Sequence, residues 1–392
     1  MSRTLRSYLL LPRPKDVIKG WLLPLSFAVG TLSVGRPEPA SLLRAAIAWG
    51  ILELLIYQAR YQWNDIRGFE ADQAHPDADE RGRLPGPIER GPSRKRASWA
   101  VVGIRLALAA AIAVAAPALD LIWIVFALVV GVFGVAIVYE VARSNATGHG
   151  QPGVTGWITS LWLVAGGGYA IRGMAGMALA VDLGGRPGLA LAATTAFWAF
   201  GVAFVTARWA LESLAFAEVT DGQLRWRLER ARAREHTTSL RRWLPSRVPD
   251  GAADGRPESW RPLAGATTLR APWNLALLVS AASAAAAGAL LQGASVWTGA
   301  VSVAGAVGAV LVARTAHARP ALLLGWAAVL ALVAWTAGIA DPGLVPLPWL
   351  LVVGGHAFFA GQSLRTVGSP VRAALDRRRP SPRRAVVSRR PA

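Results

Sequence analysis

The stretch LDLIWIVFALVVGVFGVAIVY, residues 119–139, contains one charged side chain near its start and is otherwise almost wholly apolar. About 20 apolar residues form a helix long enough to span the hydrocarbon core of a bilayer. Comparable stretches recur along the 392 residues, of which 53% are hydrophobic and 17 are tryptophan. They are long runs of Ala, Leu, Val and Gly, without the short alternating pattern of membrane β-strands. The sequence therefore predicts an all-α, polytopic transmembrane helical bundle.

The apolar stretches predict ten membrane spans, six before and four after a polar insert. Loop charge supports this count, because the cationic loops alternate with short loops that carry few cations, as the positive-inside rule requires. The Arg-rich C-terminal tail should remain in the cytoplasm, as the N-terminus does. Both termini lie on the same side of the membrane only if the number of spans is even. The predicted spans are 17–34, 41–62, 97–117, 119–139, 155–180, 188–214, 272–293, 296–315, 320–340 and 346–366.

This pattern divides the chain into four parts. Residues 1–214 hold the first six spans, 215–271 form a basic cytoplasmic insert, 272–366 hold the last four spans, and 367–392 form an Arg- and Pro-rich disordered tail. The start of the insert, LRWRLERARAREH, alternates Arg with apolar residues and predicts a helix lying on the lipid headgroups. The remainder of the insert is rich in Pro and Gly and is expected to be mobile.

Charge and cysteine content exclude several classes of function. The net charge of +19 fits positive-inside loops and contact with anionic lipid, so no nucleic-acid partner is expected. The chain has no cysteine, which excludes disulfides, thiol catalysis and Cys-ligated metal. Its Arg- and Ala-rich composition is typical of a bacterial protein from a GC-rich genome. We therefore expect a multi-pass protein of the bacterial inner membrane, with both termini in the cytoplasm.

The segment NDIRGFEAD, residues 64–72, ends the second predicted span with a cluster of oxygen-bearing side chains. If the helix continues through it at about 100° per residue, Asn64, Asp65 and Asp72 share one face and Glu70 lies on the opposite side. Such oxygens suit Mg²⁺, which binds one or two carboxylates together with water and substrate phosphates. The alternative is a polar helix end whose acidic residues balance nearby arginines.

The same segment resembles a known family. Asn64-Asp65-x-x-Gly68-x-x-x-Asp72 is similar to the N-D-x-x-D-x-x-x-D motif of the UbiA superfamily of intramembrane prenyltransferases. The continuation, with Arg67 and the pair His75-Pro76, resembles the branch that transfers phosphoribose to decaprenyl phosphate. Supporting segments are RPKDVIK (13–19) with Lys19, LVAGGGYAIRGMAG (163–176) with Arg172, and TARWALES (206–213) with Arg208 and Glu212.

The resemblance covers roughly residues 12–215 and implies a UbiA-like bundle of about nine to ten helices with a central cavity open to the cytoplasm. It implies Mg²⁺ on Asn64, Asp65 and Asp72, with Asp65 and Asp72 as catalytic residues. A polyprenyl phosphate or diphosphate lipid is then the expected partner, with phosphoribosyl pyrophosphate as a possible second substrate. The expected substrate-binding residues are Lys19, Arg60, Arg67, His75, Arg172, Arg208 and Glu212.

Two departures from the family pattern bear on activity. Gly68 replaces the central Asp of the acidic motif and removes one expected ligand, which indicates either altered chemistry or a decayed site. The second motif lacks its D-x-x-x-D, and Glu212, Glu218 and Asp221 are the acidic residues nearby.

Several charged residues have two interpretations each. Glu53 and Arg60 are seven residues apart within the second span, so they form either an internal ion pair or the polar end of a cavity. Arg172 is either an anion ligand in a cavity or a snorkelling residue, and Arg208 and Glu212 are spaced to pair with each other. The loop cations Arg67, His75, Arg81 and Arg83 bind phosphate or serve as positive-inside residues.

Three functions remain open from the sequence. The first is a Mg²⁺-dependent transferase that attaches phosphoribose to a polyprenyl phosphate. The second is a prenyltransferase or terpene cyclase using an allylic diphosphate, which an aromatic-lined cavity would favour. The third is a non-catalytic membrane protein on the same scaffold, which Gly68 would favour.

Overall fold

The computed structural model describes residues 4–12, 18–35, 37–73, 82–148, 153–220, 223–231, 233–244, 246, 267–315 and 319–360. Five helical segments in these ranges are long and apolar enough to cross a membrane: Pro39–Arg67, Ile88–Ala115, Ile122–Ala146, Pro187–Ser213 and Pro272–Leu291. Large apolar side chains such as Trp123, Phe126 and Trp335 are exposed on the outside of the bundle. This exposure suits contact with lipid, so the architecture is that of an all-α membrane bundle.

The main helical elements before the insert are α1 (Leu5–Leu10), a 3₁₀ turn η1 (Ile18–Trp21), α3 (Leu22–Val34), α4 (Pro39–Gly50), α5 (Tyr57–Arg67), α6 (Phe69–Gln73), α7 (Gly91–Ala115), α8 (Ile122–Ala146), α9 (Gly156–Ala165), α10 (Gly167–Ala180) and α11 (Pro187–Ser213). The elements after it are α14 (Pro272–Leu291), α15 (Val296–Thr315), α16 (Arg319–Thr336) and α17 (Leu347–Ala360).

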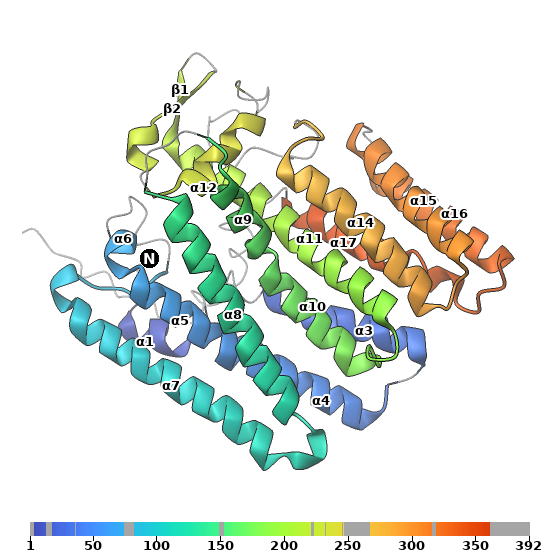
Figure 1. Cartoon of the computed structure of the whole chain (residues 1–392), viewed down its shortest axis with the longest axis horizontal. Coiled ribbons are helices and arrows are strands. Elements are labelled where there is room, and N and C mark those ends of the chain that lie inside the picture. Colours follow the sequence, from blue (N-terminus) through green and yellow to red (C-terminus); the bar gives the residue numbers. More distant parts are fainter. Residues whose placement is uncertain are drawn as a thin grey trace, which may run out of the picture.

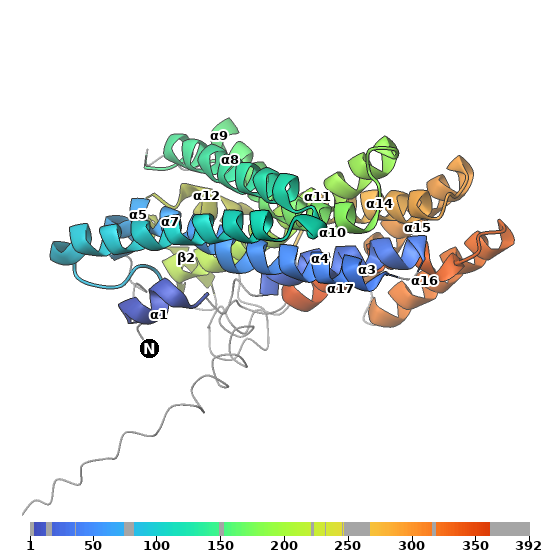
Figure 2. The same cartoon turned by 90° about the horizontal axis from the view of Figure 1, so that it is seen from below.

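The two groups of helices pack together through α11 and α14, which run side by side (Figure 1). α10 packs against α3 and α11, while α14 also contacts α15 and α17. α7 and α16 lie at opposite edges of the bundle (Figures 1 and 2). The core between α10, α11, α14 and α17 includes Tyr169, Phe200, Phe204 and Trp349.

The second predicted span is a helix with a π-helical turn at Ile51–Ile56 between α4 and α5. The Tyr57 N–H donates to the carbonyl of Leu52, five residues earlier, so this turn holds more residues than an α-helical turn. Residues on either side of it therefore lose the register that a regular helix would give. Such turns often occur at functional sites.

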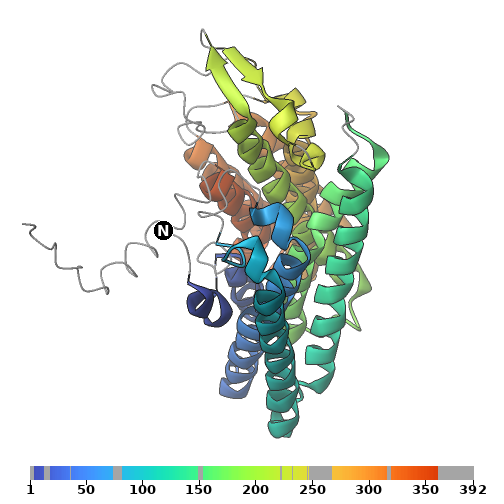
Figure 3. The same ribbon diagram turned by 90° about the vertical axis from the view of Figure 1, so that its left-hand side faces the viewer.

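The insert does not form the expected headgroup helix over LRWRLERARAREH. Instead, β1 (Ala217–Thr220) pairs with β2 (Gln223–Trp226) in an antiparallel hairpin, and α12 (Glu235–Thr238) follows. The sequence between the strands is Asp-Gly, a strong hairpin signal that outweighs the periodicity of Arg. The hairpin and α12 lie where α8 and α11 end and α9 begins (Figures 1 and 3). Residues 247–266 of the Pro- and Gly-rich remainder and the tail 367–392 lie outside the described residues.

Candidate functional site

The acidic cluster forms at the end of α5. The N–H of Gly68 donates to the carbonyl of Asn64 (3.0 Å), and the N–H of Asp72 donates to the carbonyl of Gly68 (2.8 Å). The helical path therefore continues from α5 through Gly68 into α6. Arg83 donates to Oδ1 of Asp65, and its Nε lies 3.6 Å from Oδ2 of Asp72. The predicted convergence of Asp65 and Asp72 is thus confirmed, while their role as metal ligands stays a prediction.

The loop that carries Arg83 is anchored on both sides of that residue. Leu84 is buried in a small cluster with Tyr8 and Phe69, and its carbonyl accepts from Nε2 of Gln73 at 2.8 Å. Gly86 has a φ of +124°, a conformation that a side chain would strain. These contacts hold the guanidinium of Arg83 against both carboxylates, so Arg83 belongs to the site and is more than a distant positive-inside residue.

A second cation reaches the same carboxylate from the insert. The guanidinium of Arg234 lies 4.0 Å from Oδ1 of Asp72. Burial is the main cause that lowers the pKa of Arg234, and the charge of Arg83 lowers it further, whereas Asp72 raises it. Sequence reasoning missed Arg234, because in a run of alternating arginines no local signal distinguishes it from its neighbours.

The donor set fits Mg²⁺ as a cofactor that is shared with a substrate. The carboxylates of Asp65 and Asp72 both contact the guanidinium of Arg83. Mg²⁺ usually takes one or two carboxylates plus water and phosphate oxygens. Among the described residues, no group of three or more His, Cys, Asp or Glu is placed to hold a metal. Bound phosphate would therefore have to complete the coordination.

The other residues of the segment differ in the direction they face. Glu70 is exposed and pairs with Lys95 at 2.6 Å, and this hydrogen bond lowers the pKa of its carboxyl. This agrees with the expected placement of Glu70 on the opposite side of the helix. A Cβ at Gly68 would lie 3.5 Å from Oδ2 of Asp72, so position 68 does face the site. The side chain of Asn64 is half-buried.

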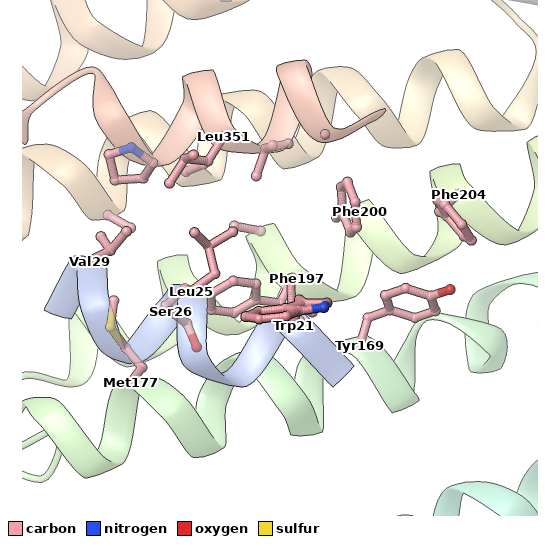
Figure 4. A pocket seen from close by; sticks show the side chains of 18 of the residues that line it. Trp21, Leu25, Ser26, Val29, Tyr169, Met177, Phe197, Phe200, Phe204 and Leu351 are labelled. Atoms are coloured by element: carbon pink, nitrogen blue, oxygen red, sulfur yellow. The ribbon is translucent and has the colours of Figure 1, made fainter. Parts of the chain in front are cut away.

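An apolar chamber of about 210 Å³ lies between η1, α3, α10, α11, α14 and α17 (Figure 4). Its aromatic lining consists of Trp21, Tyr169, Phe197, Phe200 and Phe204. Lys19 is the charged residue in the lining.

Lys19 connects the chamber to the acidic pair. Its Nζ lies 5.9 Å from the centre of the Tyr61 ring. Tyr61 precedes Asp65 by four residues on α5, so the two share a helix face one turn apart. The chamber and the carboxylates are therefore parts of one region.

Glu53 does not pair with Arg60, contrary to the expected ion pair. Its carboxylate accepts two hydrogen bonds from Arg172, at 2.6 and 3.0 Å, and both side chains are buried. The π-helical turn is the physical reason, because it changes the face on which Glu53 emerges relative to Arg60. Arg60 lies over the rings of Tyr61 and Tyr139 instead.

Arg172 is buried, as the cavity interpretation required, but its guanidinium serves the fold. It stacks 3.4 Å from the centre of the Tyr57 ring as well as pairing with Glu53. The phenol of Tyr57 in turn donates to the carbonyl of Gly168 at 2.8 Å. Arg172 therefore joins the π-helical turn to α10, and a role as a direct substrate ligand stays a prediction.

The remaining predicted residues lie at different places. Arg67 is exposed and lies over the Trp63 ring, away from the carboxylates. Arg208 and Glu212 do not pair: Glu212 is exposed, whereas Arg208 is buried against Phe204. His75 lies outside the described residues, as does Arg81.

No family model, curated protein or solved structure matches the chain. The likeness to the UbiA superfamily therefore depends on the quoted motifs alone.

Proposed function

We propose that the chain is a UbiA-type, Mg²⁺-dependent intramembrane transferase that acts on a polyprenyl lipid. The favoured reaction is phosphoribosyl transfer from phosphoribosyl pyrophosphate to a polyprenyl phosphate. One observation carries the proposal: Asp65 and Asp72 meet a cation at the end of α5, one helical turn from the Tyr61–Lys19 contact at an apolar chamber. An enzyme that joins a charged donor to a membrane lipid needs a charged site for the donor directly beside an apolar chamber for the lipid chain.

Each part of the site has a physical task. The chamber would hold the lipid chain away from water, while Lys19 would keep the anionic head near the carboxylates. Mg²⁺ bound to Asp65 and Asp72 would neutralise charge on a leaving diphosphate. Arg83 and Arg234 would donate charge-assisted hydrogen bonds to the phosphate oxygens.

The proposed transfer conserves atoms and electrons, so it needs no oxidant or reductant. An oxygen of the lipid phosphate forms a bond to the anomeric carbon of the ribose. The bond between that carbon and the pyrophosphate oxygen breaks, and its electron pair leaves with pyrophosphate. With both termini in the cytoplasm of a bacterial cell, the acidic site would face the compartment that supplies the soluble donor.

One observation favours a second candidate, a prenyltransferase or cyclase with an allylic diphosphate. Five aromatic side chains line the chamber, and aromatic faces stabilise a developing cation. Gly68 keeps the non-catalytic alternative open, because it leaves two carboxylates where the family motif has three acidic positions.

The test is incubation of the purified protein with Mg²⁺ and phosphoribosyl pyrophosphate plus a polyprenyl phosphate, or with allylic diphosphates, following pyrophosphate release. We expect release that requires Mg²⁺ and falls at least about 100-fold in Asp65→Asn, the loss typical of a deleted charge-stabilising group. Glu70→Gln is the matched control, since it removes an acid of the same segment that points away. No release from any donor, or equal loss in both variants, would refute the proposal.

A further inference from the structure

Arg208 is a buried cation for which the described residues provide no acceptor. It lies on α11 with 4% of its surface exposed, and none of its three guanidinium nitrogens has a hydrogen-bond partner among the described residues. Its guanidinium carbon is 5.4 Å from the centre of the Phe204 ring. A buried charge is costly unless it is paired, so this arrangement points to an anion that is not part of the protein.

Two further polar groups of the same kind lie near Arg208. The hydroxyl of Tyr169 on α10 and Nδ1 of His356 on α17 are buried and have no hydrogen-bond partner among the described residues. The Phe204 ring, which Arg208 contacts, lies 5.6 Å from the ring of Tyr169 and stacks on Phe200. A Cβ at Gly355, the neighbour of His356, would lie 3.9 Å from the Phe200 ring. Three helices thus supply a guanidinium, a phenol and an imidazole to one region, and all three groups can donate hydrogen bonds.

Of these three residues, Tyr169 lines the apolar chamber, whereas Arg208 and His356 adjoin the lining residues Phe204 and Gly355. Tyr169, Phe204 and Gly355 are in the chamber lining, and Gly355 adjoins His356. Figure 4 shows Tyr169 and Phe204 at one end of the chamber and Val29 and Met177 at the other. A cavity with donors at one end and an apolar body matches a molecule with an anionic head and a hydrocarbon chain.

We propose that Arg208, Tyr169 and His356 form a binding site for the phosphate head of a single-chain lipid phosphate whose chain occupies the chamber. A phosphate can accept two hydrogen bonds from a guanidinium fork and still has oxygen atoms to accept from the two further donors. The site gives α17, one of the C-terminal helices, a part in ligand binding. This inference deepens the proposed function, and rests on it in taking the bound lipid to be a substrate.

The test is binding to the full chain in phosphatidylcholine nanodiscs, measured by calorimetry with geranyl monophosphate, geraniol and inorganic phosphate as separate probes. We expect geranyl monophosphate to bind at least about tenfold more tightly than either other probe, because only it satisfies both the donors and the chamber. Arg208→Gln should weaken its binding about ten- to 100-fold, the range for a hydrogen-bonded charge. Arg44→Gln, on a half-buried cation whose guanidinium pairs with Asp120, should leave binding unchanged.

Two more variants separate binding from folding. Tyr169→Phe removes one hydroxyl and should weaken binding of geranyl monophosphate but not of geraniol. Arg208→Met should raise, or leave unchanged, the melting temperature of the ligand-free protein, since it removes a buried charge to which the described residues offer no acceptor. A lower melting temperature would mean that Arg208 has a structural role and would overturn the proposal. Geraniol binding as tightly as geranyl monophosphate would also overturn the proposal, because the phosphate would then add nothing. Inorganic phosphate binding as tightly as geranyl monophosphate would exclude a lipid ligand.

The outcome can be separated from that of the transferase test. Asp65→Asn should abolish pyrophosphate release but leave geranyl monophosphate binding intact. If no donor gives release while binding still requires Arg208, the reaction is refuted and the lipid-phosphate site stands. If release is observed but Arg208→Gln binds normally, the site is refuted and the reaction stands.

Discussion

Introducing a carboxylate at Gly68, where the similar UbiA motif has Asp, tests whether the cluster at the end of α5 is a metal site. Gly68 has a φ of −94°, so a side chain there meets no backbone strain. A Cβ would lie 3.5 Å from both Oδ2 of Asp72 and the carbonyl oxygen of Asn64, which is ordinary contact distance. Gly68→Asp is therefore expected to fold, with its carboxylate beside that of Asp72.

The electrostatic cost follows from this distance. Two carboxylates about 4 Å apart repel by about 4 kcal/mol at an effective dielectric constant of about 20, and Arg83 and water will offset part of this. In chelator, Gly68→Asp should therefore be less stable than the uncharged variant of equal size, Gly68→Asn. A bound divalent ion should reverse this difference in stability and make Gly68→Asp the more stable variant. An ion at about 100 times its Kd stabilises the folded protein by about 2.7 kcal/mol.

The assay is thermal unfolding in detergent, with a Mg²⁺ titration from chelator upwards, for wild type, Gly68→Asn and Gly68→Asp. We expect Mg²⁺ to raise the melting temperature of Gly68→Asp far more than that of the other two. Adding Asp72→Asn to Gly68→Asp should remove most of the gain. If Gly68→Asp and Gly68→Asn respond equally to Mg²⁺, the carboxylates do not form a cation site and the reasoning is wrong.

Two further predictions concern buried charge. Glu53→Gln leaves Arg172 buried beside a neutral amide and should cost about 3–5 kcal/mol of stability, whereas Glu53→Gln with Arg172→Met should recover much of it; wild-type stability in the single variant would contradict this. His236 lies in the insert, and burial lowers its pKa from 6.5 to about 3, so the unfolded chain binds its proton first as pH falls. The contribution of His236 to the free energy of unfolding is therefore complete above about pH 6.5 and declines towards pH 3 by about 1.4 kcal/mol per pH unit. Melting temperatures measured over this pH range should fall less steeply as the pH is lowered in His236→Phe than in the wild type. An equally steep fall in both proteins would contradict this prediction.

The helical fold follows from the sequence because hydrophobic length is a local property. An apolar run such as 119–139 needs no knowledge of its neighbours to be recognised, and α8 covers it from residue 122 onward. The convergence of Asp65 and Asp72 is equally local, since it depends on helical spacing over two turns. By contrast, the partner of Glu53 is 119 residues away, on α10. The π-helical turn that redirects Glu53 leaves no recognisable mark in ILELLI.

The insert shows a different limit of sequence reasoning. Alternating Arg and apolar residues suited either a strand or a surface helix, and the Asp-Gly turn decided for a hairpin. Arg234 reaches Asp72 only because α12 packs against α8, α9 and α11. Tertiary packing therefore selects one arginine from a run that is uniform in sequence.

The buried arginines of the bundle show how structural and ligand-binding charges can be distinguished. Arg105 on α7 donates to the carbonyls of Leu54 and Leu9, at 2.9 and 2.8 Å, and so ties α1 to the π-helical turn. Arg172 has the carboxylate of Glu53. Both cations are satisfied by the protein, so their burial is explained by the fold. Arg208 is as buried as these two, yet the described residues offer its guanidinium no acceptor. Since the membrane interior makes each of these charges costly, we propose a ligand for the one to which the described residues offer no acceptor.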